Sequence, residues 1–105
     1  MDGLQIVAEP RRREILRLVW DRERSVSDLA GHFDITIGAV SQHLAVLREA
    51  GYVEVRKDRN QRLYRANQEG LGELRAVLEG MWTATLDRLA RAVEAETIEE
   101  DLRDR

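Results

Sequence analysis

The sequence predicts a mainly α-helical protein with one small β-hairpin, in the order α-α-α-α-β-β-α, over a single domain of residues 1–105. Three observations predict this class. Apolar residues recur along most of the chain at the spacing of an amphipathic helix. Alternation with a period of two, typical of a half-buried strand, is confined to residues 52–66. The chain also holds one Pro and 5% aromatic residues, which argues against a β-sandwich.

The first two predicted helices lie on either side of Pro10. Residues 4–9 form a short apolar segment with Leu4, Val7 and Ala8 on one face. Pro10 suits the first position of a helix, where its missing N–H would have no partner in any case, so the second helix is expected over residues 10–21. The buried face of this second helix is expected to contain Ile15, Leu16, Val19 and either Leu18 or Trp20.

Two further helices follow, joined by a turn of about three residues. The third is expected to begin at Ser25 or Ser27 and to end at Phe33. The fourth begins at Thr36, whose hydroxyl can accept a hydrogen bond from a free amide of the first turn. It ends at Gly51, since Gly adopts the left-handed conformation after a helix with little strain. Two short helices in this arrangement form a helix-turn-helix.

The fourth helix has an unusual outer face. Val40, Leu44 and Leu47 recur at helical spacing and are expected to be buried. A surface helix normally carries Glu, Lys and Arg on its opposite side. Here that side is small or hydrogen-bonding, and uncharged, which indicates close contact with a ligand. Its residues are Gly38, Ser41, Gln42 and Ala45.

A basic hairpin is predicted directly after the helix-turn-helix. Residues 52–56 and 62–66 alternate as strands, and residues 57–61 are polar and turn-prone. A solvated hairpin usually mixes its charges, whereas this tip has Asp58 as its one acid. Its position and charge indicate a wing that lies along a phosphate backbone. The cations of the tip and its flanks are Arg56, Lys57, Arg59, Arg62 and Arg65.

One long helix is predicted over residues 68–96, with residues 97–105 as a frayed tail. About 25 residues of helix exceed what a domain of this size can bury against itself. Part of its apolar stripe, including Trp82, is therefore expected to pack against a second copy of the chain. The alternative is a helix that lies wholly across its own domain. The stripe consists of Leu71, Leu74, Leu78, Met81, Trp82, Leu86, Leu89 and Val93.

The distribution of charge permits DNA binding although the net charge is −3. Residues 1–66 hold 12 Lys and Arg against 10 Asp and Glu, whereas residues 67–105 hold 5 against 10. The acid is therefore concentrated away from the fourth helix and the hairpin. Arg11, Arg12 and Arg13 crowd the unfavourable end of the second helix dipole. They form either a solvated turn or a cluster in which Arg12 pairs with a carboxylate or a DNA phosphate.

Composition excludes several classes of protein. The absence of Cys excludes disulfides, thiolate metal ligands and thiol redox sensing. No apolar run approaches the roughly 20 residues that span a bilayer, so no membrane partner is expected. Residues near Met1 lack the apolar core of a signal peptide, and the expected location is the cytoplasm. Ser41 and His43 cannot act as a nucleophile and base, because residues two apart on a helix do not face each other, so we expect no enzyme.

Four segments of this sequence resemble the ArsR/SmtB family of bacterial winged-helix repressors. They are AEPRRREIL (residues 8–16), SVSDLA (25–30), ITIGAVSQHLAVLREAGYVEVRKD (35–58) and RLYRA (62–66). The resemblance implies a winged helix-turn-helix homodimer that binds double-stranded DNA at a dyad-symmetric operator. Its dimer is formed by the first and last helices, here residues 1–9 and 68–96. The corresponding interface residues are Leu4, Val7, Leu78, Trp82, Leu86, Leu89 and Val93.

The same resemblance places the DNA contacts on the fourth helix and the wing. Gln42 suits bidentate pairing with adenine in the major groove, and Ser41 can contact a base edge or a phosphate. The recognition-helix positions are Thr36, Ile37, Gly38, Ser41, Gln42 and His43. The wing positions, expected to bind phosphate or the neighbouring minor groove, are Arg56, Lys57, Arg59 and Arg62.

Many members of the family sense metals, but this sequence departs from them. Ser25-Val26-Ser27 stands where the family's metal site uses Cys, and no His lies beyond His43 to form its other site on the last helix. We therefore expect no metal, no cofactor and a repressor that does not respond to metal through these sites. No small-molecule effector is indicated. The alternative function is a winged helix that binds other proteins without DNA.

Overall fold

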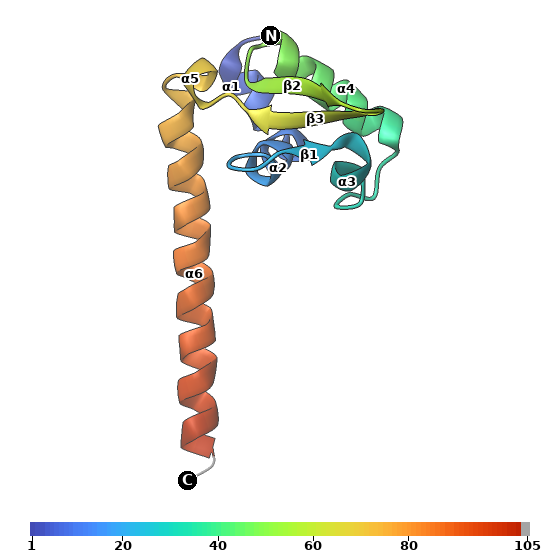
Figure 1. The fold of residues 1–105 in the computed structure, drawn as a ribbon. Helices are drawn as coiled ribbons and strands as arrows, with labels where there is room; N and C mark the ends of the chain where they lie inside the picture. Colours follow the sequence, from blue (N-terminus) through green and yellow to red (C-terminus); the bar gives the residue numbers. More distant parts are fainter. Residues whose placement is uncertain (104–105) are drawn as a thin grey trace. The chain divides into compact units, whose positions relative to one another are not determined.

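A computed structural model describes the backbone of residues 1–103 and the side chains of residues 1–96. The elements follow one another along the chain as Figure 1 shows. They are α1 (Gly3–Ala8), α2 (Pro10–Leu18), β1 (Arg24–Ser25), α3 (Val26–Ala30), α4 (Ile37–Glu49), β2 (Val53–Asp58), β3 (Gln61–Ala66), α5 (Gln68–Leu71) and α6 (Leu74–Arg103).

The chain divides into two compact units, residues 1–75 and 76–105. The first unit contains the helix-turn-helix of α3 and α4, followed directly by the hairpin of β2 and β3. This order confirms the predicted winged helix-turn-helix. The predicted domain of residues 1–105 thus corresponds to a winged-helix unit and a unit that consists, in its described part, of α6.

Local signals of the sequence define the ends of α4. The Thr36 hydroxyl accepts a hydrogen bond from the backbone N–H of Ala39 at 3.0 Å, as predicted for an N-cap. Gly51 follows the helix with φ +81°, a conformation that favours glycine. The predicted inner face is confirmed, because Val40, Leu44 and Leu47 are all buried.

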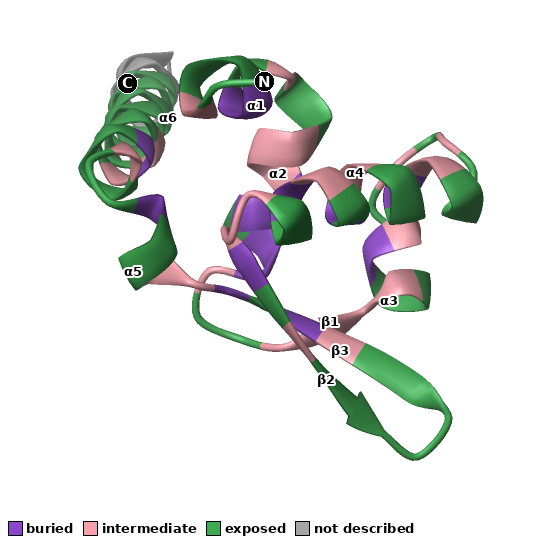
Figure 2. Ribbon diagram, turned by 90° about the horizontal axis from the view of Figure 1, so that it is seen from above, coloured by how far each residue is buried: buried purple, intermediate pink, exposed green. Residues whose placement is uncertain are grey.

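The sheet has three antiparallel strands in the order β1-β3-β2. β2 and β3 pair from Val53 opposite Ala66 to Asp58 opposite Gln61, which leaves a two-residue turn at the tip. β1 was not predicted, because two residues show no alternation. In Figure 2 the ends of β2 and β3 near the helices include buried residues, whereas the tip of the hairpin is exposed.

The core lies where α2, α3 and α4 meet the sheet. Its members include Ile15, Leu16, Leu29 and Leu44, each at most 1% exposed. Of the two alternatives for the face of α2, Leu18 is buried and Trp20 is half-buried. α2 ends three residues earlier than predicted, because the backbone N–H of Ala66 in β3 binds the carbonyl of Val19 at 2.9 Å.

The structure shows which residues of α1 are buried and confirms Ser25, one of the two predicted starts, as the cap of α3. In α1 the buried residues are Ile6 and Val7, while Leu4 and Ala8 are exposed, because the Asp2 capping box sets the start of this six-residue helix. α3 is capped by Ser25, whose hydroxyl accepts from Asp28 N–H at 3.1 Å, so Ser27 is not the cap.

The arginines at the start of α2 bind the end of α1. Arg12 Nε donates to the carbonyl of Ile6 at 2.8 Å, and Arg13 Nη1 donates to those of Val7 and Ala8 at 2.9 and 2.8 Å. The last carbonyls of a helix have no partner within it, so these guanidinium groups satisfy them. The prediction that Arg12 pairs with a carboxylate is therefore wrong, and its half-buried side chain does not form a freely solvated turn either, while its pairing with a DNA phosphate stays a prediction.

The segment after β3 is joined to the end of α4. Asn67 Nδ2 donates to the carbonyl of Gly51 at 3.1 Å, and the backbone N–H of Asn67 donates to Tyr52 O at 2.8 Å. Gly70 packs so closely that an added Cβ would lie 2.1 Å from the Gly51 carbonyl oxygen. Residues 67–71 are therefore fixed against the turn that ends α4.

The predicted helix over residues 68–96 is interrupted. Gly72 has φ +56° and separates α5 from α6, which then continues to Arg103 through the segment predicted to fray. Residues 104–105, the end of that predicted tail, lie outside the described residues. Within the described part of the chain, no helix is both long and apolar enough to cross a membrane.

Candidate DNA interface

The outer face of α4 is exposed and uncharged over its first turns. Val40 and Leu44 hold the helix to the core, which turns the opposite side to solvent. Ile37 at the start of the helix is 57% exposed. The Thr36 hydroxyl is occupied by its capping bond. The exposed residues on this side are Thr36, Ile37, Gly38, Ser41, Gln42 and Ala45.

His43 does not belong to this face. Its ring is half-buried, and Nδ1 lies 3.8 Å from Oε2 of Glu9, the residue between α1 and α2. The same Glu9 carboxylate caps α2 by accepting from the backbone N–H of Arg12 at 3.0 Å. His43 therefore faces the α1–α2 junction, whereas Ser41 and Gln42 remain exposed.

The wing presents cations that the protein itself leaves free. Lys57, Arg59 and Arg62 are exposed, and no ion pair of the described residues involves them. Arg59, at the tip, has φ +57° and is the one non-glycine residue with positive φ in the described part of the chain. These three side chains are therefore available to a polyanion.

Arg56 differs from the other wing cations. Its Nε donates to the Glu23 carboxylate at 2.6 Å, and this hydrogen bond raises the pKa of the Arg56 guanidinium above its usual value. Glu23 lies 33 positions earlier in the chain, in the segment before β1. Of the four predicted wing residues, Arg56 thus already has an anionic partner.

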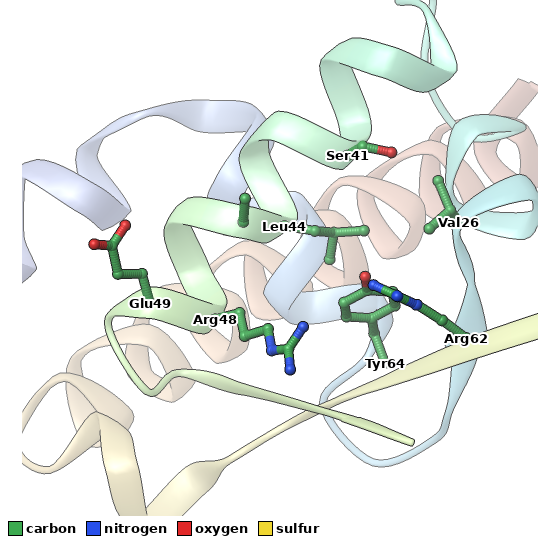
Figure 3. A pocket seen from close by; sticks show the side chains of 8 residues that line it. Val26, Ser41, Leu44, Arg48, Glu49, Arg62 and Tyr64 are labelled. Carbon is green, nitrogen blue, oxygen red and sulfur yellow. The ribbon is translucent and has the colours of Figure 1, made fainter. Parts of the chain in front are cut away.

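A hollow of about 600 Å³ lies between α4 and β3. Figure 3 shows the guanidinium groups of Arg48, from α4, and Arg62, from β3, on the same side of the hollow as Tyr64. Ser41, Ala45 and one acid, Glu49, line it as well, so the hollow adjoins the uncharged face of α4 and holds two cations and one carboxylate. Arg48 is not among the predicted DNA contacts, although residues 41, 45 and 48 are spaced i, i+4, i+7 and therefore share one face of the helix.

This arrangement defines a protein that binds double-stranded DNA. A helix of this width fits the major groove, an uncharged polar face suits base edges, and flanking cations suit phosphates. Within the described residues, no three His, Cys, Asp or Glu side chains gather where they could hold a metal ion.

The chain belongs to the family described as "Bacterial regulatory protein, arsR family", whose profile matches residues 9–55. The HTH-type transcriptional regulator Rv2034 of Mycobacterium tuberculosis is 34% identical over 88% of this chain and 86% of its own. The protein is therefore a transcriptional regulator of ArsR type and not an enzyme, as the sequence predicts.

Two further relatives carry names with opposite directions of control. The transcriptional activator HlyU of Vibrio cholerae is 36% identical over 72% of this chain and 68% of its own. The biofilm growth-associated repressor of Agrobacterium fabrum is 33% identical over 82% of this chain and 74% of its own. The relatives of this chain therefore include both an activator and a repressor.

Solved structures share the fold. A crystal structure described as a possible transcriptional regulator for arsenical resistance is 44% identical, covers 88% of this chain and 96% of its own, and gives a TM-score of 0.68. The homodimeric winged helix-turn-helix DNA-binding domain of Mb0332 from Mycobacterium bovis, solved by NMR, is 27% identical with a TM-score of 0.66. The similarity to the Mb0332 domain covers 77% of this chain and 75% of the Mb0332 chain.

Proposed function

We propose that the protein is a homodimeric repressor, acting in the cytoplasm, that binds a dyad-symmetric operator with one α4 in each of two successive major grooves. The observation that carries this proposal is the exposed, uncharged face of α4 beside unpaired cations of the wing. In a two-fold dimer the two reading helices are about 34 Å apart, one turn of DNA.

Within each half-site, Ser41 and Gln42 face base edges, and Lys57, Arg59 and Arg62 bind phosphates. The hollow between α4 and β3 adds Arg48 to the phosphate contacts, because its guanidinium and that of Arg62 border the same opening. Base contacts then select the sequence, and phosphate contacts fix the register.

The apolar residues of α6 supply the second copy's binding surface. Val77, Met81, Leu86, Leu89 and Val93 are each at least 45% exposed, and Leu86, Leu89 and Val93 share one side of the helix, an apolar surface that association with a second copy would cover. Val7 and Leu78 were predicted for this interface, but both are buried within the single chain, so the proposed interface leaves them out. The exposed Leu4 and the half-buried Trp82 remain part of it.

Repression would follow from occupancy, because a dimer that covers two half-sites in a promoter excludes the polymerase. Release would require a ligand or partner with different affinity for the bound and free forms of the dimer.

The test is an electrophoretic mobility shift on the chain's own promoter region, paired with transcription from that promoter in vitro. We expect a shift at sub-micromolar protein and reduced transcription. Increased transcription would make the protein an activator. The absence of a shift well above micromolar protein would leave the protein-binding module as the function.

The role of Gln42 is tested with Gln42→Ala. We expect a loss of about 1–3 kcal/mol on the selected operator and relaxed preference at one position in each half-site. Binding to random-sequence DNA should be unchanged. A uniform loss on all sequences would place Gln42 outside the reading surface.

The dimer is tested with Leu89→Glu, which adds a charge to the exposed apolar face of α6. We expect monomers in sedimentation equilibrium and weaker operator binding. Arg88→Glu changes the charge at the neighbouring position and controls for charge alone. A persistent Leu89→Glu dimer would contradict this interface.

A further inference from the structure

Ile37 is an exposed apolar side chain that the fold does not use. In residues 1–75 the large apolar side chains that are exposed are Met1, Leu4 and Ile37. Met1 and Leu4 lie at the N-terminus, and Leu4 is one of the residues proposed for the dimer interface. Ile37 stands apart from them as the first residue of α4.

The surroundings of Ile37 are open and uncharged. Gly38, the next residue, has space for a side chain, since an added Cβ would meet only the Thr36 hydroxyl at 3.8 Å. A single exposed apolar residue is ordinary on a protein surface, so its position decides its meaning. Here it lies on the first turn of the recognition helix, and that turn is the part of such helices that contacts base edges.

We propose that Ile37 contacts the C5-methyl group of a thymine in each half-site, and that this contact selects thymine over cytosine at that position. The inference rests on the proposed DNA binding. The thymine methyl is the one apolar group that base pairs present in the major groove. Ile37 offers apolar surface and no hydrogen-bonding side-chain atom, so it recognises a methyl group and no polar base edge.

The size of the effect follows from the burial of one methyl group. Removing that group costs about 0.8 kcal/mol, which corresponds to about a fourfold loss of affinity for one half-site and about 15-fold for both.

The experiment begins with operators that the full-length protein selects from a random duplex library. Each thymine is then replaced by deoxyuridine, symmetrically in both half-sites. This substitution removes the methyl and keeps the base pair and the O4 acceptor. We expect one position at which the wild type loses about 15-fold, and 5-methylcytosine there should bind better than cytosine.

Two variants assign the methyl contact to a residue. Ile37→Ala should bind the thymine and deoxyuridine operators equally at that position. Ser41→Ala, on the same face of α4, should lower affinity for both operators through the loss of its own base contact, but should keep the full ratio of thymine to deoxyuridine affinities. Because both side chains are exposed, thermal unfolding should show both variants folded.

The outcomes separate the two proposals. If the library yields no selected sequence, the proposed function fails. If a sequence is selected but no thymine depends on its methyl, or if Ile37→Ala keeps that dependence, the role of Ile37 is overturned while DNA binding stands.

Discussion

Two arginine-rich segments of this protein look alike in the sequence and differ in the structure. Residues 11–13 and residues 56–62 both crowd cations into a short stretch. In the first, Arg12 and Arg13 donate to the carbonyls that end α1. In the second, Arg59 and Arg62 have no ion-pair partner in the described part of the chain. The availability of a cation depends on what the fold places beside it, and its abundance in the sequence does not reveal this.

The largest effect should come from Arg12→Ala. Because hydrogen bonds from a charged group contribute about 1.5–3 kcal/mol, the free energy of unfolding should fall by about 2 kcal/mol in denaturant titration. Arg11→Ala is the control, since Arg11 is exposed and makes no hydrogen bond or ion pair within the described residues. A normal unfolding energy combined with a lower salt dependence of DNA binding would instead place Arg12 on DNA.

A smaller effect, in binding alone, should come from Arg62→Ala. Loss of one phosphate contact in each half-site lowers the slope of log affinity against log salt by about 1.8 for the dimer, with stability within about 0.5 kcal/mol of the wild type. Arg65→Ala is matched in charge and strand, but Arg65 lies on the other face of β3, opposite Glu54. Equal losses in the two variants would mean that the hollow does not bind phosphate.

An effect of similar size on binding, together with a small gain in stability, should come from Arg59→Gly at the tip of the wing. A left-handed conformation costs an L-residue about 1–2 kcal/mol, and substitution by Gly relieves this strain. The greater freedom of Gly in the unfolded chain offsets about 0.5–1 kcal/mol of the stability gained in this way. We therefore expect stability to rise by about 0.5 kcal/mol while the salt slope of DNA binding falls by about one for each half-site, or about two for the dimer. Thermal unfolding and filter binding measure the two.

Asn60→Gly is the control for Arg59→Gly, because Asn60 shares the turn but not the positive φ. It should lower stability and keep the salt slope. If Arg59→Gly binds DNA as the wild type does, the strained arginine has no role in phosphate binding.

Elements with signals in neighbouring residues were predictable. The cap at Thr36, the apolar spacing of α4 and the glycine at position 51 each act within one helix, so the recognition helix follows from the sequence. The alternation of the wing strands is equally local. The family resemblance then added which positions on these elements are expected to face DNA.

Features that depend on distant partners were not predictable. The Glu23–Arg56 ion pair joins residues 33 positions apart, and β1 exists only because Arg24 and Ser25 meet β3. Likewise, the role of Arg12 depends on where α1 ends. Arg48 is a different case, because its helical spacing from Ser41 is a local signal that already places it on the same face of α4.

The close packing at Gly70 fixes the C-terminal end of α4 rigidly to the segment that precedes α6. No side chain fits between Gly70 and the Gly51 carbonyl, and Asn67 holds that same carbonyl. A displacement of α5 would therefore also move the C-terminal end of α4. The proposed base contacts lie at the opposite end of α4, so substitutions at Gly70 are expected to shift the orientation of this helix without changing any of the proposed contact residues.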